Sequence, residues 1–259
     1  EYSQTDILNA WLLQPTNDAA KSDAGYPLLL FLHGAGERGD NPALVGVHGP
    51  FKILANADRA KEWKFFTVAP QCPGVRFWSP DQMILLIKQI CDRYPIDRSR
   101  IYVTGLSMGG FGTWGIVAHS ENLVAAAAPL CGGYGLEFAD KMTKTPIWAF
   151  HGDADGAVNY EKDKALVEAV KAAGNEDIVL TTYPGVGHDC WTRTYDNPEL
   201  YDWFLSKSLE STAKPGEMTL REFVLPAQKG AERDGSDALD ETRTETRAAW
   251  VFVPTSDEA

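Results

Sequence analysis

Ser107 lies at the centre of Gly105-Leu106-Ser107-Met108-Gly109, which has the pattern G-x-S-x-G. Residues 101–104 are β-branched or aromatic and predict a strand, and residues 108–119 carry apolar side chains at near-helical spacing. Between a strand and a helix, this pattern forms a sharp turn that presents a strained, exposed serine hydroxyl. Such a serine attacks acyl carbons. The alternative is a plain turn that ends a strand, and the two flanks favour the nucleophile.

A serine nucleophile needs an imidazole that takes its proton and a carboxylate that orients the imidazole. In enzymes with this turn, the acid and then the histidine follow the serine along the chain. Of the five histidines, only His188 lies far enough downstream. It follows the strand-like residues 178–182 in the glycine-rich stretch 183–189. We therefore predict that His188 is the base; the alternative is a surface loop histidine.

The acid should follow the strand-like residues 146–150, where Asp153 and Asp155 are both candidates. The arrangement H-G-x-x-D-x-x-V favours Asp155 as the acid, and Asp153 then bonds its own turn. His151 could bind a metal with these two aspartates, but no further histidine or cysteine with ligand spacing lies nearby. We therefore predict no metal site.

The oxyanion of an acyl intermediate requires two backbone N–H donors. Met108 follows the nucleophile and supplies one of them. The apolar run 28–32 predicts a strand buried on both faces, and the glycine-rich residues 33–40 follow it. We assign the second donor to Ala35, with Gly36 as the alternative; a plain glycine-rich turn is the simpler interpretation.

Residues 33–41, 105–110, 151–155 and 187–189 together resemble bacterial α/β-hydrolase esterases. The resemblance is to the group of dienelactone-hydrolase, prolyl-oligopeptidase and polyhydroxybutyrate-depolymerase-like sequences, and it covers about residues 28–209. Several members of this group are carboxylesterases or feruloyl and acetyl-type carbohydrate esterases. The resemblance implies a triad of Ser107, Asp155 and His188, and ester hydrolysis without a cofactor. It does not fix the substrate.

The elements that must position these residues alternate along the chain. Strands are expected at 28–32, 101–104, 124–130, 146–150 and 178–182, and helices at 81–94, 108–119, 160–173 and 197–209. This alternation predicts an α/β fold with a mostly parallel central sheet and helices on both faces. Ligands bind beyond the carboxyl ends of the strands in such a sheet. Only the short stretch 131–145 could cover the site, so we expect no large lid domain and an open site that suits bulky or polymer-linked esters.

Composition limits the partners. The chain has 259 residues, of which 44% are hydrophobic, and its formal net charge is −12. Such an acidic chain has no electrostatic footprint for nucleic acid or anionic membranes, and no apolar run is long enough to span a bilayer. The sequence begins with Glu1 and shows no signal peptide. A mature secreted or periplasmic protein would begin this way, as would a trimmed cytoplasmic one, and the oligomeric state stays open.

Four cysteines, Cys72, Cys91, Cys131 and Cys190, allow up to two disulfides. Cys131 and Cys190 are both expected at the edge of the sheet that carries the site, where a bridge between them would fix the His188 loop. Four separate thiols are at least as consistent with the sequence, because buried free cysteine is common.

Domain organisation changes near residue 210. Residues 1–210 form the expected catalytic domain, and the polar stretch 211–259 forms a C-terminal extension whose middle has the composition of a linker.

We predict a serine hydrolase of carboxylic esters, with a serine peptidase or a lactone or thioester hydrolase as the enzymatic alternative. A binding module is the non-enzymatic alternative. Trp78 and Trp191 are candidate substrate contacts or core residues, and Trp114 is expected mainly in the core.

Overall fold

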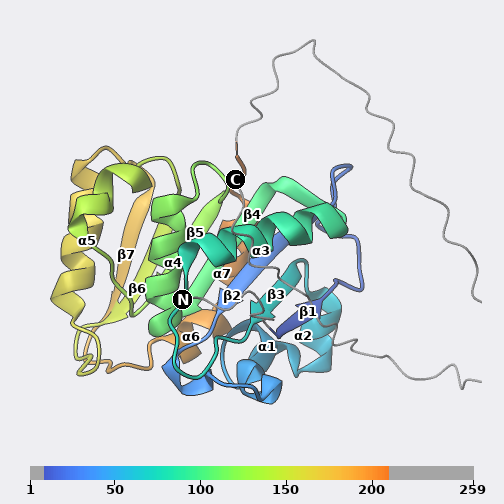
Figure 1. Ribbon diagram of the computed structural model, residues 1–259, viewed down its shortest axis with the longest axis horizontal. Helices are drawn as coiled ribbons and strands as arrows, with labels where there is room; N and C mark the ends of the chain where they lie inside the picture. Colours follow the sequence, from blue (N-terminus) through green and yellow to red (C-terminus); the bar gives the residue numbers. More distant parts are fainter. Residues whose placement is uncertain (1–8, 210–259) are drawn as a thin grey trace, which may run out of the picture.

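A single mixed sheet organises the protein (Figure 1). The computed structural model describes residues 9–209. Within them, seven strands pair in the order β1-β3-β2-β4-β5-β6-β7. Only β1 pairs antiparallel, with β3, and every other neighbouring pair of strands is parallel. The strands are β1 (Ala10–Leu13), β2 (Tyr26–Leu32), β3 (Phe66–Pro70), β4 (Ile96–Leu106), β5 (Ala126–Leu130), β6 (Ile147–Gly152) and β7 (Ile178–Tyr183).

The central strands are continuous apolar runs because both faces of the sheet are covered. Every residue of β2, β3 and β5 is buried. Side chains that alternate along these strands enter two separate cores. Leu28, Leu30 and Leu32 contribute to one core, and Leu29 and Phe31 contribute to the other.

Helices cover each face of the sheet (Figure 1). The first core is closed by α3 (Pro80–Arg93), α4 (Met108–His119), α5 (Tyr160–Ala172) and the 3₁₀ helix η3 (Leu136–Met142). The second core is closed by α1 (Gly49–Leu54), α6 (Trp191–Asp196) and α7 (Pro198–Leu205), and α2 (Ala57–Glu62) packs against α1. Two further 3₁₀ turns, η1 (Ala35–Glu37) and η2 (Pro42–Gly46), follow β2. The predicted α/β fold with helices on both faces is therefore confirmed.

Local signals set several helix starts. Ser79, Asn159 and Asn197 cap α3, α5 and α7 by accepting backbone N–H bonds with their side chains. The helix expected at 197–209 is shorter than predicted and ends at Leu205. Beyond it, the N–H of Leu209 donates to Ser99 O at 2.8 Å, so the chain turns to follow the first part of β4 instead of continuing the helix.

The loops that hold the predicted catalytic residues all follow the carboxyl ends of β2, β4, β6 and β7, on the same side of the sheet. The stretch expected to be too short for a lid holds only η3, and no inserted domain occurs among the described residues. Residues 9–209 include no helix that is long and apolar enough to cross a membrane. The extension proposed at 211–259 lies outside the described residues.

Candidate active site

The turn between β4 and α4 holds Ser107 in a conformation that side chains rarely adopt. Its backbone has φ 52° and ψ −116°, and a residue other than glycine is strained at such a φ. Close backbone packing forces the turn. A Cβ on Gly109 would lie 1.9 Å from Leu32 O, and one on Gly105 would lie 2.4 Å from Gly109 O. Strand, turn and helix therefore pack in a way that requires these glycines and lifts Ser107 out of the sheet.

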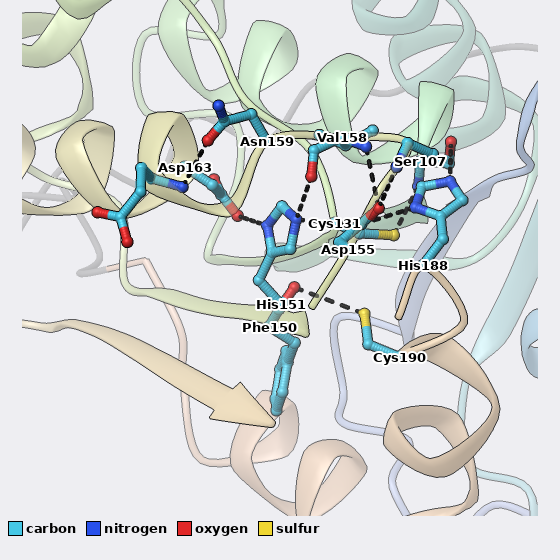
Figure 2. Close-up of polar contacts among 12 residues, drawn as sticks. Ser107, Cys131, Phe150, His151, Asp155, Val158, Asn159, Asp163, His188 and Cys190 are labelled. Atoms are coloured by element: carbon cyan, nitrogen blue, oxygen red, sulfur yellow. Dashed lines mark hydrogen bonds and ion pairs between the residues drawn. The ribbon is translucent and has the colours of Figure 1, made fainter. Parts of the chain in front are cut away.

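Figure 2 shows the three predicted side chains in one hydrogen-bonded line. His188 Nε2 lies 2.9 Å from Ser107 Oγ, and His188 Nδ1 lies 2.7 Å from Asp155 Oδ2. The carboxylate accepts the Nδ1 proton, so Nε2 is left to accept the proton of the serine hydroxyl. The arrangement can activate Ser107 as a nucleophile.

The Asp155 carboxylate is fixed on both oxygens. Its Oδ1 accepts the N–H groups of Ala157 and Val158 at 2.8 and 2.9 Å. Burial favours the neutral acid, but the hydrogen bonds from His188, Val158 and Ala157 outweigh it and lower the pKa of Asp155. Asp155 is therefore a charged and oriented carboxylate.

The alternative acid, Asp153, is exposed and serves another purpose. Its Oδ1 accepts the N–H of Gly185 at 2.6 Å. This bond joins the β6 loop to the loop that carries His188, instead of closing the aspartate's own turn as expected. The two aspartates therefore differ in their partners, and only Asp155 contacts His188.

His151 has protein partners on both ring nitrogens. Asp163 Oδ2 lies 2.8 Å from His151 Nδ1, and Val158 O lies 3.2 Å from its Nε2. Both ring nitrogens face acceptors at hydrogen-bonding distance, and the absence of a metal site at His151 stays a prediction. Asp163 was not singled out in the sequence, because a lone aspartate in an amphipathic helix resembles a solvent-exposed residue.

The loop after β2 approaches Ser107 as an oxyanion site requires. A Cβ on Gly34 would lie 3.7 Å from Ser107 Cβ, so the segment Gly34–Ala35 borders the nucleophile. Met108 is the first residue of α4, where helical N–H groups have no partner within the helix. Assignment of the two donors to Met108 and Ala35 stays a prediction.

Buried His33 anchors this loop. Its Nδ1–H donates to Gly34 O at 2.6 Å, and its Nε2 accepts the N–H of Cys72 at 3.0 Å. Burial lowers the pKa of His33 to about 4. Trp78 packs edge-on against the ring and donates to His33 O at 3.0 Å. Trp78 is only 8% exposed, which favours the core alternative over substrate contact.

Trp191 lies at the mouth of the site. Its half-buried ring stands edge-on to His188, with centroids 5.1 Å apart, and contacts His48 in the same manner at 5.5 Å. Glu37 Oε1 lies 3.8 Å from His48 Nε2. Trp114, by contrast, is fully buried, as expected for a core residue.

All four cysteines are free and buried. Cys131 follows β5 with φ 40°, and its Sγ accepts the N–H of Ser107 at 3.3 Å. Its thiol contacts that of Cys190, and burial raises the pKa of the Cys131 thiol. The structure thus has separate thiols where a bridge was one alternative, and one of them supports the nucleophile turn (Figure 2).

Comparison with known proteins identifies the relatives of this chain. Residues 83–203 match the dienelactone hydrolase family. The chain is 28% identical over 200 residues to the bifunctional acetylxylan esterase/xylanase XynS20E of Neocallimastix patriciarum, with 73% of this chain and 27% of that protein covered. It is 33% identical over 143 residues to acyl-protein thioesterase 1 of Neurospora crassa, with 51% of this chain and 55% of that protein covered.

The fold has close counterparts among solved structures. A thermostable esterase superimposes with a TM-score of 0.66 and 31% identity, with 79% of this chain and 64% of that chain covered. The chain spans only about a quarter and about half of the lengths of the two curated relatives above. The range that matches the dienelactone hydrolase family, residues 83–203, includes Ser107, Asp155 and His188.

Proposed function

Residues 83–203 match the dienelactone hydrolase family, and from that match we propose that the chain is a serine hydrolase that cleaves carboxylic esters. The observation that supports the proposal most is the line Ser107–His188–Asp155, with separations of 2.9 and 2.7 Å. Every member of a triad is present, and a strained turn carries the serine. These features argue against a binding module, which has no need of a strained serine beside a base.

The proposed reaction proceeds through an acyl-enzyme. Ser107 Oγ attacks the acyl carbon while His188 Nε2 takes its proton, and the N–H groups of Met108 and Ala35 stabilise the oxyanion. His188 then protonates the leaving alcohol, and water repeats the sequence to release the acid. Asp155 holds His188 in the required tautomer throughout. The chemistry needs no cofactor.

The substrate proposed is a bulky or carbohydrate-linked ester of the feruloyl or acetyl type. Beside Trp191 lies a cavity of about 310 Å³, whose lining includes His48, Asn56 and Thr192. A sugar, which is rich in hydroxyl groups, fits this cavity chemically, because the lining combines an aromatic ring with several polar side chains. The likeness to an acetylxylan esterase supports the same class.

Thioester hydrolysis is the second candidate. It is favoured by the 33% identity to an acyl-protein thioesterase, and the same triad geometry can attack either carbonyl. The two candidates differ in the group that leaves, an alcohol or a thiol, and so they can be separated by measurement.

The test compares the native protein with Ser107→Ala on p-nitrophenyl acetate, an acetylated xylo-oligosaccharide, methyl ferulate and an acyl thioester. The native protein should hydrolyse the oxygen esters and react with a fluorophosphonate probe. Ser107→Ala should lose on the order of 10⁶-fold in kcat and all labelling, with unchanged circular dichroism. Activity of the variant within tenfold of native would refute the proposal, and a higher kcat/KM on the thioester would favour the second candidate.

A further inference from the structure

A second buried histidine–aspartate pair stands behind the proposed acid (Figure 2). His151 Nε2 lies 3.2 Å from Asp155 Oδ2, the same oxygen that contacts His188 Nδ1. On the far side of the ring, Asp163 Oδ2 lies 2.8 Å from His151 Nδ1. The side chains of His151, Asp155 and Asp163 are all 0% exposed. The chain of close polar contacts from Ser107 therefore continues beyond the triad, through an ion-pair contact between Asp155 and His151 and a hydrogen bond between His151 and Asp163.

The partners of His151 determine where its protons lie. Nε2 faces two groups that only accept, the Val158 carbonyl at 3.2 Å and the Asp155 carboxylate, so this nitrogen must carry a hydrogen. Nδ1 shares a proton with Asp163, whose other oxygen accepts the Trp114 Nε1–H at 3.0 Å. Burial raises the pKa of Asp163, and the pKa of His151 is also raised because the nearby Asp163 outweighs burial. Both shifts favour the state in which the pair holds one proton.

We propose that His151 and Asp163 form a positioning dyad, which holds the Asp155 carboxylate in line with His188 and turns its positive end, the imidazole, toward that carboxylate. The proposal rests on the proposed function, because it assigns the dyad to that triad. His151 acts through Asp155 and touches no reacting atom. The main-chain bonds from Ala157 and Val158 fix only Oδ1, so the dyad acts on the oxygen that orients the base.

Other groups near the dyad belong to several elements. Tyr160 of α5 stands edge-on to His151, with the ring centroids 5.7 Å apart. Cys190, at the start of α6, makes a smaller contribution that raises the pKa of His151. Cys131 Sγ, an Asp155 oxygen and a His188 nitrogen lie within 4.8 Å of one another. None of these neighbours is a second carboxylate on Nε2. The group nearest to Asp155 on this side is therefore the His151 imidazole, with the Asp163 carboxylate beyond it.

Asp163→Asn tests the charge. An asparagine can accept the Trp114 N–H with its oxygen and donate to His151 Nδ1 with its amide, which leaves His151 neutral and keeps its Nε2–H. The substitution removes the imidazolium and the Asp163 carboxylate together, and the imidazolium is the nearer of the two to Asp155, so the Asp155 carboxylate should attract a proton on the base more strongly. The acid limb of kcat/KM, which reports protonation of the general base, should move to higher pH by about half a unit, with kcat on the alkaline plateau little changed.

His151→Phe/Asp163→Asn tests the positioning. It keeps a ring in the core and removes the Nε2–H that faces Asp155, without leaving Asp163 as an unpaired buried carboxylate. We expect kcat for p-nitrophenyl acetate to fall by about 10- to 100-fold while KM stays within about twofold, since displacement of a catalytic group costs rate more than binding. Glu161→Gln is the control on α5, because its side chain is 72% exposed; its kcat and pH profile should match the native protein.

The outcomes separate this proposal from the one on which it rests. An unmoved acid limb in Asp163→Asn would refute the dyad even if melting temperature fell, because a merely structural pair would change stability alone. If the double variant fails to fold, the acid limb of Asp163→Asn alone still tests the proposed dyad. Native-like hydrolysis by Ser107→Ala would instead refute the proposed function itself. An inactive Ser107→Ala with an unmoved limb in Asp163→Asn would remove only the dyad.

Discussion

Three histidines of this chain show how burial and partners, more than residue type, define a role. His188 lies between a hydroxyl and a carboxylate, His151 between two carboxylates, and His33 between a carbonyl oxygen and an N–H. The order of motifs along the chain is enough to single out His188. Sequence alone could not separate the other two, because their partners, Asp163 and Cys72, lie in other elements of the chain and carry no motif of their own.

The neutral state of His33 makes stability depend on pH. In the folded chain its pKa is about 4, below the ordinary value of 6.5. Between these values only the unfolded chain binds the proton, so stability is full above pH 6.5 and falls as the pH drops toward 4. The loss amounts to about 3 kcal/mol. Urea unfolding at pH 7 and at pH 4.5 would measure it.

His33→Asn is the comparison for this prediction. The variant should be less stable than the native protein at pH 7, and the gap should shrink as the pH falls, because the asparagine does not titrate. Other ionisable groups contribute equally to both proteins. A gap that stays constant between pH 7 and pH 4.5 would contradict the assignment of this pH dependence to His33.

At the scale of elements, the turn after β4 tolerates no side chain on its inner glycines. A methyl group at Gly109 would lie 1.9 Å from Leu32 O and 2.9 Å from His33 O, both main-chain atoms. Gly109→Ala should therefore lower the free energy of unfolding by about 3 kcal/mol or more and displace the loop after β2. Gly46→Ala, with nothing within 4 Å of its Cβ, should stay near native in a denaturant titration. Equal stability of the two variants would refute this packing argument.

Elements with a local signal could be predicted, and those set by distant contacts could not. The strand, turn and helix around Ser107 follow from apolar spacing and glycine placement. The end of α7 does not, because Lys207 O accepts the Tyr102 hydroxyl at 2.7 Å and Leu209 bonds to Ser99. The polar, six-residue α6 carries no apolar periodicity, and β1 is only four residues long at the edge of the sheet. Both elements depend on tertiary packing.

The overall fold could be predicted from the alternation of strand-like and helix-like segments, because a parallel sheet covered on both faces requires that alternation. The candidate triad was also predictable, since three loops leave one edge of such a sheet. The substrate was not, because side chains from η1, α1 and α6 meet only after folding to form the mouth of the site. His48 and Trp191, for example, are 143 positions apart in the chain and contact each other.

Truncation tests the boundary proposed near residue 210. The sheet, both cores and the candidate triad lie within residues 9–209. We therefore expect a chain that ends at Leu209 to fold cooperatively and to keep its kcat on p-nitrophenyl acetate within about twofold, because it retains the described core. Thermal unfolding and steady-state kinetics would check this. Insoluble protein would contradict the boundary and would make residues 210–259 part of the folding unit.

The bond between Leu209 and Ser99 has a practical consequence. Ser99 lies in β4, and the strand runs from there for about 26 Å before it reaches Ser107. Ser208 is exposed at that remote end of the sheet, and all four native thiols are buried. A Ser208→Cys chain would thus carry a single reachable handle for maleimide coupling. Molecules coupled to a bead through this residue would all present the active site to the solution, where an insoluble polymer could reach it.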